Sequence, residues 1–153
     1  MTYVIERAGL ADVEDIAPLF DAYRCFHGCA ADPDLARSFI GERLERSEST
    51  IFVARLAART VGFTQLYPSF TSTGAARIFI LNDLYVAPEA EGQGVATALM
   101  KAAEAFARSN GAMSLRLATG VDNHRAQALY RRTGWVRTDA YLTYELPLRA
   151  QAA

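Results

Sequence analysis

Lysine is nearly absent from this chain of 153 residues. Of the 16 basic residues, 15 are arginine, and Lys101 is the single lysine. The chain also lacks an excess of charge of either sign, because 17 aspartates and glutamates bring the formal net charge to -1. A chain with this balance does not carry the basic surface that nucleic-acid-binding proteins use. We therefore expect no nucleic-acid partner.

Long apolar runs are missing as well, although 51% of the residues are hydrophobic. Arg, Glu or Gly interrupts every apolar stretch well before the roughly 18 residues that a membrane-spanning helix needs. The first residues, 1–7, carry neither the basic start nor the apolar stretch of a secretory signal peptide. These absences predict a cytoplasmic protein with no membrane partner.

Cysteine is scarce and closely spaced. Cys25 and Cys29 flank His27, and a reducing compartment would keep both as thiols. Three candidate ligands within so short a segment, with no fourth nearby, match no common zinc spacing. We therefore expect no metal site. His27 remains open as a proton relay, a substrate contact or an ordinary loop histidine.

The length and composition fit a single domain of residues 1–153, with an α/β (α+β) fold. Folding at this length buries roughly 70% of the surface of the unfolded chain, so the core needs neither a disulfide nor a metal. The periodicity of the apolar residues predicts the order βααβββαβαββ. Strands are expected at 3–7, 50–57, 60–67, 78–86, 113–117, 135–136 and 141–148, and helices at 11–23, 33–44, 95–109 and 123–132.

Capping residues and prolines support several of these boundaries. Asp32 is typical of a helix N-cap, with Pro33 at the first helical position. Asp122 or Asn123 can cap the last helix in the same way. Pro68 is expected to end the hairpin that the strands at 50–57 and 60–67 form.

The strand at 78–86 is apolar on both faces except for Asn82 and Asp83 in its middle. Polar side chains in a buried strand cost free energy unless they are hydrogen-bonded, so we expect this pair to have a structural or functional role. A glycine loop follows at 91–94, directly before the helix at 95–109. The first N–H groups of a helix lack partners within it, and glycines let a ligand approach the backbone closely. The segment therefore suits an anion.

The loop departs from two known nucleotide-binding patterns. A dinucleotide fingerprint would have glycine where the chain has Thr97, and an acidic residue ending a second strand about 20 residues later. A P-loop would contain Gly-Lys followed by Ser or Thr, which is absent. The residues alone leave open a tight turn without a ligand and a regulatory module that binds a free nucleotide.

Two segments resemble the signatures of the GCN5-related N-acetyltransferases (GNAT). Residues 84–96 are similar to the acetyl-coenzyme A (acetyl-CoA) loop, whose pattern of Arg or Gln, two residues, Gly, one residue, and Gly or Ala falls on Glu91, Gly94 and Ala96. The run from Asn123 through Tyr130 to Gly134-Trp135 resembles the second signature. The resemblance covers essentially the whole chain. It implies a central, mixed and mostly antiparallel sheet flanked by helices.

The resemblance implies transfer of an acetyl group from acetyl-CoA to a primary amine by direct attack. Glu91 departs from the pattern, and a carboxylate near a pyrophosphate is electrostatically unfavourable. The implied cosubstrate contacts are Leu84, Tyr85, Val86, Glu91, Gly92, Gln93, Gly94, Val95, Ala96, Thr97 and Asn123.

The chemistry requires that the amine lose a proton, since an amine with a pKa near 10.4 is only about one part in a thousand neutral at pH 7.4. The resemblance makes Asp83 the candidate base, with Asn82 assisting through water, and Tyr130 the acid that protonates the leaving thiolate. The alternatives are a structural partner for Asp83 and a core position behind Trp135 for Tyr130. The implied amine site includes Tyr23, Phe26, His27 and Asn82.

The acceptor is expected to be a small molecule, such as a polyamine or an amino acid. A protein lysine or an N-terminal amine remains an alternative, and so does a non-catalytic acyl-CoA sensor, which the departure at Glu91 favours. The family also implies a homodimer through closing strands or helices.

Overall fold

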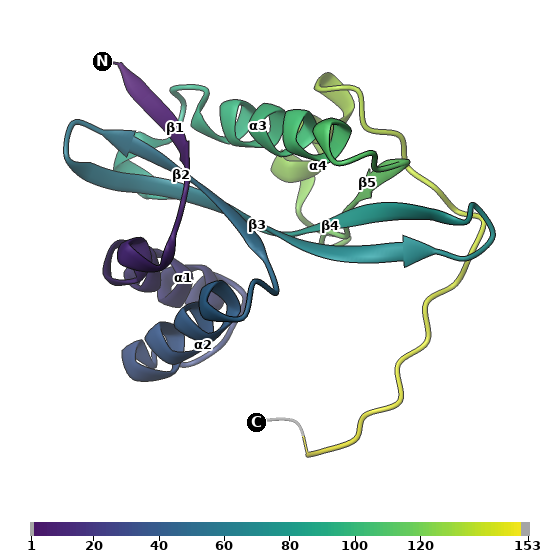
Figure 1. Ribbon diagram of the computed structural model, residues 1–153, viewed down its shortest axis with the longest axis horizontal. Coiled ribbons are helices and arrows are strands. Elements are labelled where there is room, and N and C mark those ends of the chain that lie inside the picture. Colours follow the sequence, from purple (N-terminus) through teal and green to yellow (C-terminus); the bar gives the residue numbers. More distant parts are fainter. Residues whose placement is uncertain (1, 151–153) are drawn as a thin grey trace. The chain divides into compact units, whose positions relative to one another are not determined.

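The computed structural model describes residues 2–150, and the chain divides into two compact units between residues 118 and 119. Figure 1 shows the elements of each unit. The first contains β1 (Tyr3–Arg7), the 3-10 turn η1 (Leu10–Asp12), α1 (Val13–Phe26), α2 (Pro33–Glu45), β2 (Thr50–Leu56), β3 (Arg59–Thr71), β4 (Ala76–Val86), the 3-10 turn η2 (Pro88–Ala90), α3 (Val95–Ser109) and β5 (Ser114–Arg116). The second contains α4 (His124–Arg132).

The first unit is built on a mixed sheet in the order β1-β2-β3-β4-β5. The pairs β1–β2, β2–β3 and β3–β4 are antiparallel, and β4–β5 is parallel. The return from β4 to the parallel β5 passes through α3, because a parallel pair needs a crossover connection. This confirms the fold class, a mostly antiparallel α/β sheet with helices beside it.

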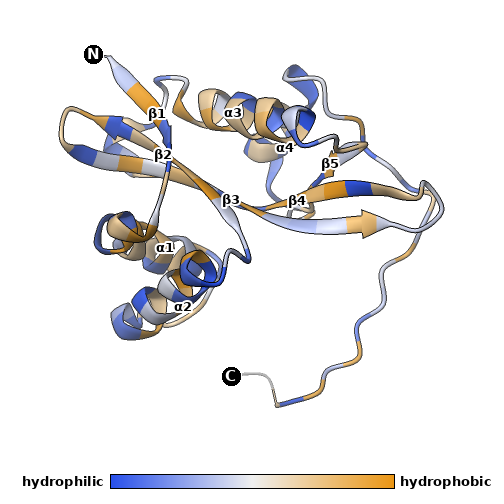
Figure 2. Ribbon diagram, in the orientation of Figure 1, coloured by the Kyte–Doolittle hydropathy of each residue, from blue (hydrophilic) through white to orange (hydrophobic). Residues whose placement is uncertain are grey.

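The helices of the first unit pack on two different sets of strand residues, which alternate as the pleat requires. Ile16 and Phe20 of α1 pack with Ile51, Val53 and Phe63 of the sheet, together with α2. The opposite residues of the same strands face α3, and this second cluster contains Ala54, Val61, Ala90, Val95 and Leu99. In Figure 2 the central strands and α3 carry many of the orange, hydrophobic residues.

The sequence signals at the helix starts are confirmed with small shifts. The helix expected from residue 11 begins as η1 and continues as α1 to Phe26. The Asp32 side chain accepts a hydrogen bond from the Leu35 backbone N–H at 3.2 Å, with Pro33 in the first turn of α2. Within residues 2–150, no helix combines the length and the apolar character that crossing a membrane requires.

The prediction that the hairpin ends near Pro68 is confirmed, but the strand is longer than expected, because β3 continues through Pro68 to Thr71. The pairing of β3 with β2 stops at Leu66, while its pairing with β4 continues to Thr71. Beyond Leu66, β3 is therefore an edge strand. Proline is tolerated there because no ladder hydrogen bond is required on the free side.

The two closing strands expected at 135–136 and 141–148 are also absent from the described residues. The alternation of apolar and polar residues in the second segment is typical of a half-buried strand. In the structure these apolar side chains are instead 80–90% exposed: Tyr141, Leu142, Tyr144, Leu146 and Leu148. A strand pattern forms a strand only where a neighbouring backbone pairs with it.

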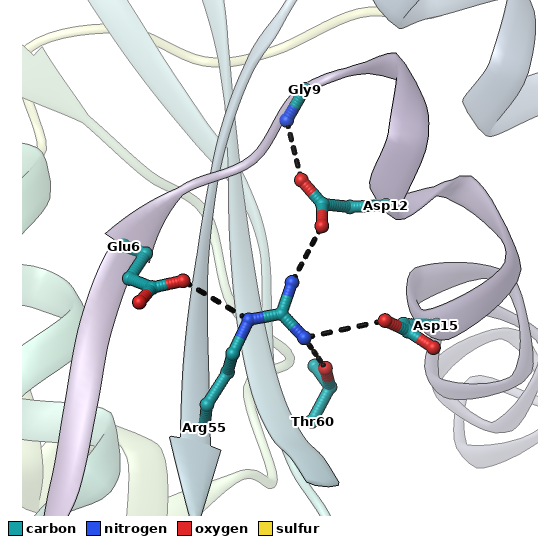
Figure 3. Close-up of polar contacts among 6 residues, drawn as sticks. All are labelled: Glu6, Gly9, Asp12, Asp15, Arg55 and Thr60. Carbon is teal, nitrogen blue, oxygen red and sulfur yellow. Dashed lines mark hydrogen bonds and ion pairs between the residues drawn. The ribbon is translucent and has the colours of Figure 1, made fainter. Parts of the chain in front are cut away.

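One arginine connects five elements of the first unit (Figure 3). Arg55 of β2 is 18% exposed, and its guanidinium donates to three carboxylates and a hydroxyl. Its partners are Asp12 at 2.6 Å, Thr60 at 2.8 Å, Glu6 at 3.1 Å and Asp15 at 3.2 Å. Burial opposes the charge of Arg55, but the hydrogen bonds of Asp15 and Glu6 and the charge of Asp12 raise its pKa.

Replacing Arg55 with methionine should lower the free energy of unfolding by about 2 kcal/mol, since a largely buried guanidinium loses its charge-assisted hydrogen bonds to three carboxylates. Urea unfolding followed by circular dichroism measures this loss. The matched control is Arg108→Met, which breaks an exposed pair with Glu104 on α3 and should cost less than about 0.5 kcal/mol. Equal losses in both variants would contradict a special role for the Arg55 cluster.

Candidate active site

A β-bulge in β4 places the polar pair that the sequence singled out. Gln65 of β3 pairs with Asp83, but the next pair joins Leu66 to Leu81, so Asn82 has no partner on β3. Bulges re-aim side chains and occur often beside active sites. Asn82 therefore interrupts the ladder, and Asp83 is the first residue paired after it.

Asp83 is fully buried at this bulge, with 1% of its surface exposed. Both carboxylate oxygens accept hydrogen bonds: Oδ2 from Gln65 Nε2 at 2.6 Å and Oδ1 from Asn82 Nδ2 at 2.8 Å. Thr64 Oγ1 donates to the backbone oxygen of Asp83 at 2.8 Å. Hydrogen bonds from Thr64, Gln65 and Asn82 thus fix the polar groups of Asp83.

The pKa of Asp83 reflects opposing influences. Burial raises it above the ordinary carboxyl value, because the ionised form is poorly solvated. The hydrogen bonds from Asn82 and Gln65, and the charge of His27, act in the opposite direction. A buried carboxyl with a raised pKa is suited to accept a proton.

The last turns of α1 lie beside the bulge. The hydroxyl of Tyr23 donates to the backbone oxygen of Asn82 at 3.1 Å, and the rings of Tyr23 and His27 are 4.7 Å apart. The structure therefore brings together Tyr23, His27, Asn82 and Asp83. Phe26 lies further out: its side chain is 68% exposed and its ring contacts that of His27 at 5.2 Å.

Gln65 and Tyr67 of β3 complete this cluster, and the sequence assigns no role to Gln65. Burial, followed by the charge of Asp83, raises the pKa of Tyr67 to about 12, against the smaller effects of Arg43 and of a hydrogen bond with Gln65. A signal for Gln65 was present in the sequence. Like Asp83, it is a polar residue in an otherwise apolar strand, and the same argument applies to it.

The glycine loop leads into α3 with the backbone that an anion site requires. Gly92 and Gly94 have φ angles of +76° and +79°, which favour glycine. Ala98 N–H is the first to bond within the helix, to Gly94 O at 3.0 Å. The N–H groups of Val95, Ala96 and Thr97 precede that bond. Tyr3 OH of β1 also donates to Gly94 O, at 3.0 Å, and holds the loop in place.

The end of β4 connects the loop to the bulge. Leu84 and Val86 pack toward α3, whereas Tyr85 packs toward α1. Burial raises the pKa of Tyr85, and the negative charges of Glu89 and Glu91 raise it further. Glu91 and Gln93 are exposed in the loop, so the unusual carboxylate lies where the resemblance places the cosubstrate.

The second unit carries the other predicted residues. Asn123 Oδ1 accepts from Ala126 N–H at 3.2 Å, which confirms Asn123 as the N-cap of α4. The ring of Tyr130 packs against Trp135, with centroids 6.1 Å apart. Burial raises the pKa of Tyr130, and a hydrogen bond with Thr119 partly offsets it. Tyr130 is therefore protonated at neutral pH and able to donate.

No group of three or more potential metal ligands occurs within residues 2–150. Cys25 and Cys29 are exposed free thiols. His27, between them, contacts the rings of Tyr23 and Phe26.

A mostly antiparallel sheet, a bulged central strand and a glycine loop at a helix start together define an acetyltransferase architecture. The profile of the Acetyltransferase (GNAT) family matches residues 16–135. The uncharacterized N-acetyltransferase YhfO of Bacillus subtilis is 41% identical over 147 residues, covering 96% of this chain and 99% of its own. The chain belongs to the GNAT family and is an N-acetyltransferase.

Other relatives and solved structures agree with this assignment. An aminoglycoside N(6')-acetyltransferase of Stenotrophomonas maltophilia is 28% identical, over 82% of this chain and 84% of its own. The crystal structure of a probable acetyltransferase, 41% identical, superposes with a TM-score of 0.91 over 97% of this chain and 99% of its own. An aminoglycoside N-acetyltransferase solved with CoA shares the fold at 18% identity, with a TM-score of 0.81 over 95% of each chain.

Proposed function

We propose that this protein transfers the acetyl group of acetyl-CoA to the primary amine of a small molecule, by direct attack within one domain of residues 1–153. The observation that carries the proposal is the buried Asp83 carboxylate, held in a bulge beside the end of α1. A titratable group with a raised pKa among aromatic and polar side chains is typical of an active site.

The proposed reaction balances once every proton is followed. Asp83, directly or through a water held by Asn82, accepts a proton from the ammonium group of the substrate. The neutral amine then attacks the thioester carbonyl carbon, the new C–N bond forms, the nitrogen loses its second proton to solvent, and the C–S bond breaks. Tyr130 donates its hydroxyl proton to the departing thiolate. A thiol has a pKa near 8.5, so this donation aids the reaction without being obligatory. Asp83 then releases its proton to solvent, and Tyr130 regains one from solvent.

Acetyl-CoA is proposed to bind along the end of β4 and at the start of α3. The N–H groups of Val95, Ala96 and Thr97 and the open backbone at Gly92 suit the pyrophosphate. Leu84, Tyr85 and Val86 would align the pantetheine arm, and the family resemblance gives Asn123 a cosubstrate contact as well. The exposed Glu91 carboxylate opposes this anion, so backbone groups must supply most of the attraction.

The acceptor is proposed to be a small cationic amine, such as a polyamine, an amino acid or an amino sugar. Tyr23, His27 and the exposed Phe26 offer ring faces to a cation near Asp83. Two similar proteins are named as aminoglycoside acetyltransferases, which supports a small-molecule acceptor. A protein lysine or an N-terminal amine is the competing acceptor class.

A thiol-release assay tests the proposal. Purified protein, acetyl-CoA and a panel of polyamines, amino acids, aminoglycosides and lysine peptides would be compared, and we expect amine-dependent release of CoA with small molecules only. Release of CoA with lysine peptides alone would show that the acceptor is a protein amine and not a small molecule. Tight CoA binding measured by calorimetry, with no release for any amine, would identify an acyl-CoA sensor and overturn the proposal.

The segment 141–148 supports a homodimer as the partner state. Leu142, Tyr144, Leu146 and Leu148 are exposed, and their spacing of two residues would put them on one side of a strand. A contiguous exposed apolar surface of this kind marks an interaction site. We propose that the segment pairs as a strand with the sheet edge of a second copy, where β5 leaves one side unpaired in the sheet order.

Replacing Leu146 with glutamate should convert the dimer to a monomer, because a charge then falls on the buried side of the intermolecular strand. Size-exclusion chromatography with light scattering measures the mass. Thr143→Glu, on the other side of the same strand, should leave the dimer intact. A monomeric wild type, or a dimeric Leu146→Glu variant, would contradict the proposed interface.

A further inference from the structure

Gln65 is a buried polar residue that the reaction described so far does not use. Its side chain is fully buried, and its Nε2 donates to Asp83 Oδ2 at 2.6 Å. Its Oε1 is buried as well and has no hydrogen-bond partner among the described residues. An unpartnered buried oxygen lowers stability, so a residue that carries one needs a compensating role.

We propose that Gln65 is a positioning residue that fixes the Asp83 carboxylate in the β4 bulge and stabilises its ionised form for proton acceptance. This inference rests on the proposed role of Asp83 as the base. Gln65 itself touches neither the amine nor acetyl-CoA. It acts on the reaction through Asp83 alone.

The geometry divides the two carboxylate oxygens between two donors. Gln65 holds Oδ2 from within the sheet, whereas Asn82, which is exposed, holds Oδ1. The exposed donor marks the side from which a proton can arrive. Gln65 thus anchors the buried oxygen and prevents rotation of the carboxylate. A hydrogen bond to the charged form of a carboxyl favours that form.

Other charged and titratable groups face Asp83 and must be separated from Gln65 in a test. From α1, His27 and Tyr23 lie beside the bulge, and the charge of His27 favours ionised Asp83. From β3, Tyr67 interacts with both Asp83 and Gln65, and Arg43 of α2 acts on Tyr67. Because the charge of His27 also acts on Asp83, the experiment includes a background that lacks His27.

The test measures kcat/KM for the amine between pH 5 and 9 in the wild type, Gln65→Leu and Thr64→Val. In Gln65→Leu we expect about a tenfold loss below neutral pH that disappears at alkaline pH, with an unchanged KM for acetyl-CoA. The acid limb of the profile moves to higher pH because Asp83 loses a donor. Thr64→Val removes a bond to the Asp83 backbone instead, so its acid limb should stay at the wild-type pH. The same comparison in a His27→Gln background isolates Asp83.

Carbon NMR of aspartate labelled at the carboxyl carbon measures the pKa of Asp83 without substrate, with Asp83→Asn assigning the signal. A higher pKa in Gln65→Leu together with the shifted acid limb supports the inference. A higher pKa without any change in the pH profile would retain the effect of Gln65 on Asp83 but reject Asp83 as the base. An unchanged pKa in the folded variant overturns the inference. Gln65→Glu, which keeps the volume and places a second carboxyl beside Asp83, should raise the pKa further and serves if the leucine variant does not fold.

Discussion

Asp83→Asn is expected to lower kcat for acetyl transfer by about 10²- to 10³-fold, with acetyl-CoA affinity within about twofold of the wild type. General base catalysis contributes roughly 10²- to 10⁴-fold in enzymes, and asparagine cannot accept the amine proton. The change preserves the shape of the side chain. Steady-state thiol release measures kcat, and calorimetry measures CoA affinity.

The same substitution should raise the free energy of unfolding at neutral pH. The pKa of Asp83 is raised in the folded protein, so folding disfavours the ionised carboxylate. Stability from this group is therefore lost as the pH rises from the ordinary value of 3.8 through the raised folded pKa. Asparagine removes that pH-dependent loss, and rotation of the Gln65 amide would offer its Oε1 to the new donor.

The combination of lost activity and gained stability separates a base from a structural partner. A structural Asp83 would give a variant that unfolds more easily and keeps its activity in proportion to the folded fraction. Asp34→Asn is a matched control, because its carboxylate is exposed at the start of α2. We expect wild-type activity and stability in that control. A stable, fully active Asp83→Asn variant would remove Asp83 from the reaction.

Tyr130→Phe should reduce kcat by about 10²-fold and leave acetyl-CoA affinity nearly unchanged. Phenylalanine keeps the ring that packs against Trp135, so the substitution removes only the hydroxyl. Burial raises the pKa of this hydroxyl, and the group therefore stays a donor across the working range of pH. Single-turnover measurements with saturating amine report the chemical step directly.

Tyr141→Phe is the control for this second substitution, since Tyr141 lies in the same unit with its side chain 88% exposed. It should retain full activity. Equal rates for Tyr130→Phe and the wild type would show that Tyr130 acts only as a packing residue. Loss of CoA binding in Tyr130→Phe would instead place the hydroxyl in the cosubstrate site.

Much of the first unit follows from local patterns. Asp32 and Pro33 announce the start of α2, and the apolar alternation of 50–57 matches β2. These signals depend on residues close in sequence, which a single chain displays directly. The polar pair Asn82-Asp83 was visible for the same reason, because it interrupts an apolar strand.

The rest depends on contacts between distant residues. Pro68 is typical of a strand end, but its missing N–H would disrupt the sheet only if β2 extended far enough to pair with it. The bulge at Asn82 and the link from Gln65 to Asp83 depend on the register between β3 and β4, which no local pattern fixes. The segment 141–148 has a correct strand pattern, yet its pairing depends on a neighbour. Sequence periodicity indicates which secondary structure a segment can adopt, but not which other segment it pairs with.

The bulge in β4 also has an evolutionary consequence, because it can be inserted or removed without changing the rest of the sheet. Leu81 pairs with Leu66 before the bulge, and Asp83 pairs with Gln65 after it, so the alternation on either side is already in phase. Deleting Asn82 would thus leave regular pairing and put no side chain on the wrong face. A regular strand and this one differ by a single inserted residue. An ancestral sheet could gain or lose the backbone oxygen that Tyr23 contacts in one mutational event, without having to be refolded around it.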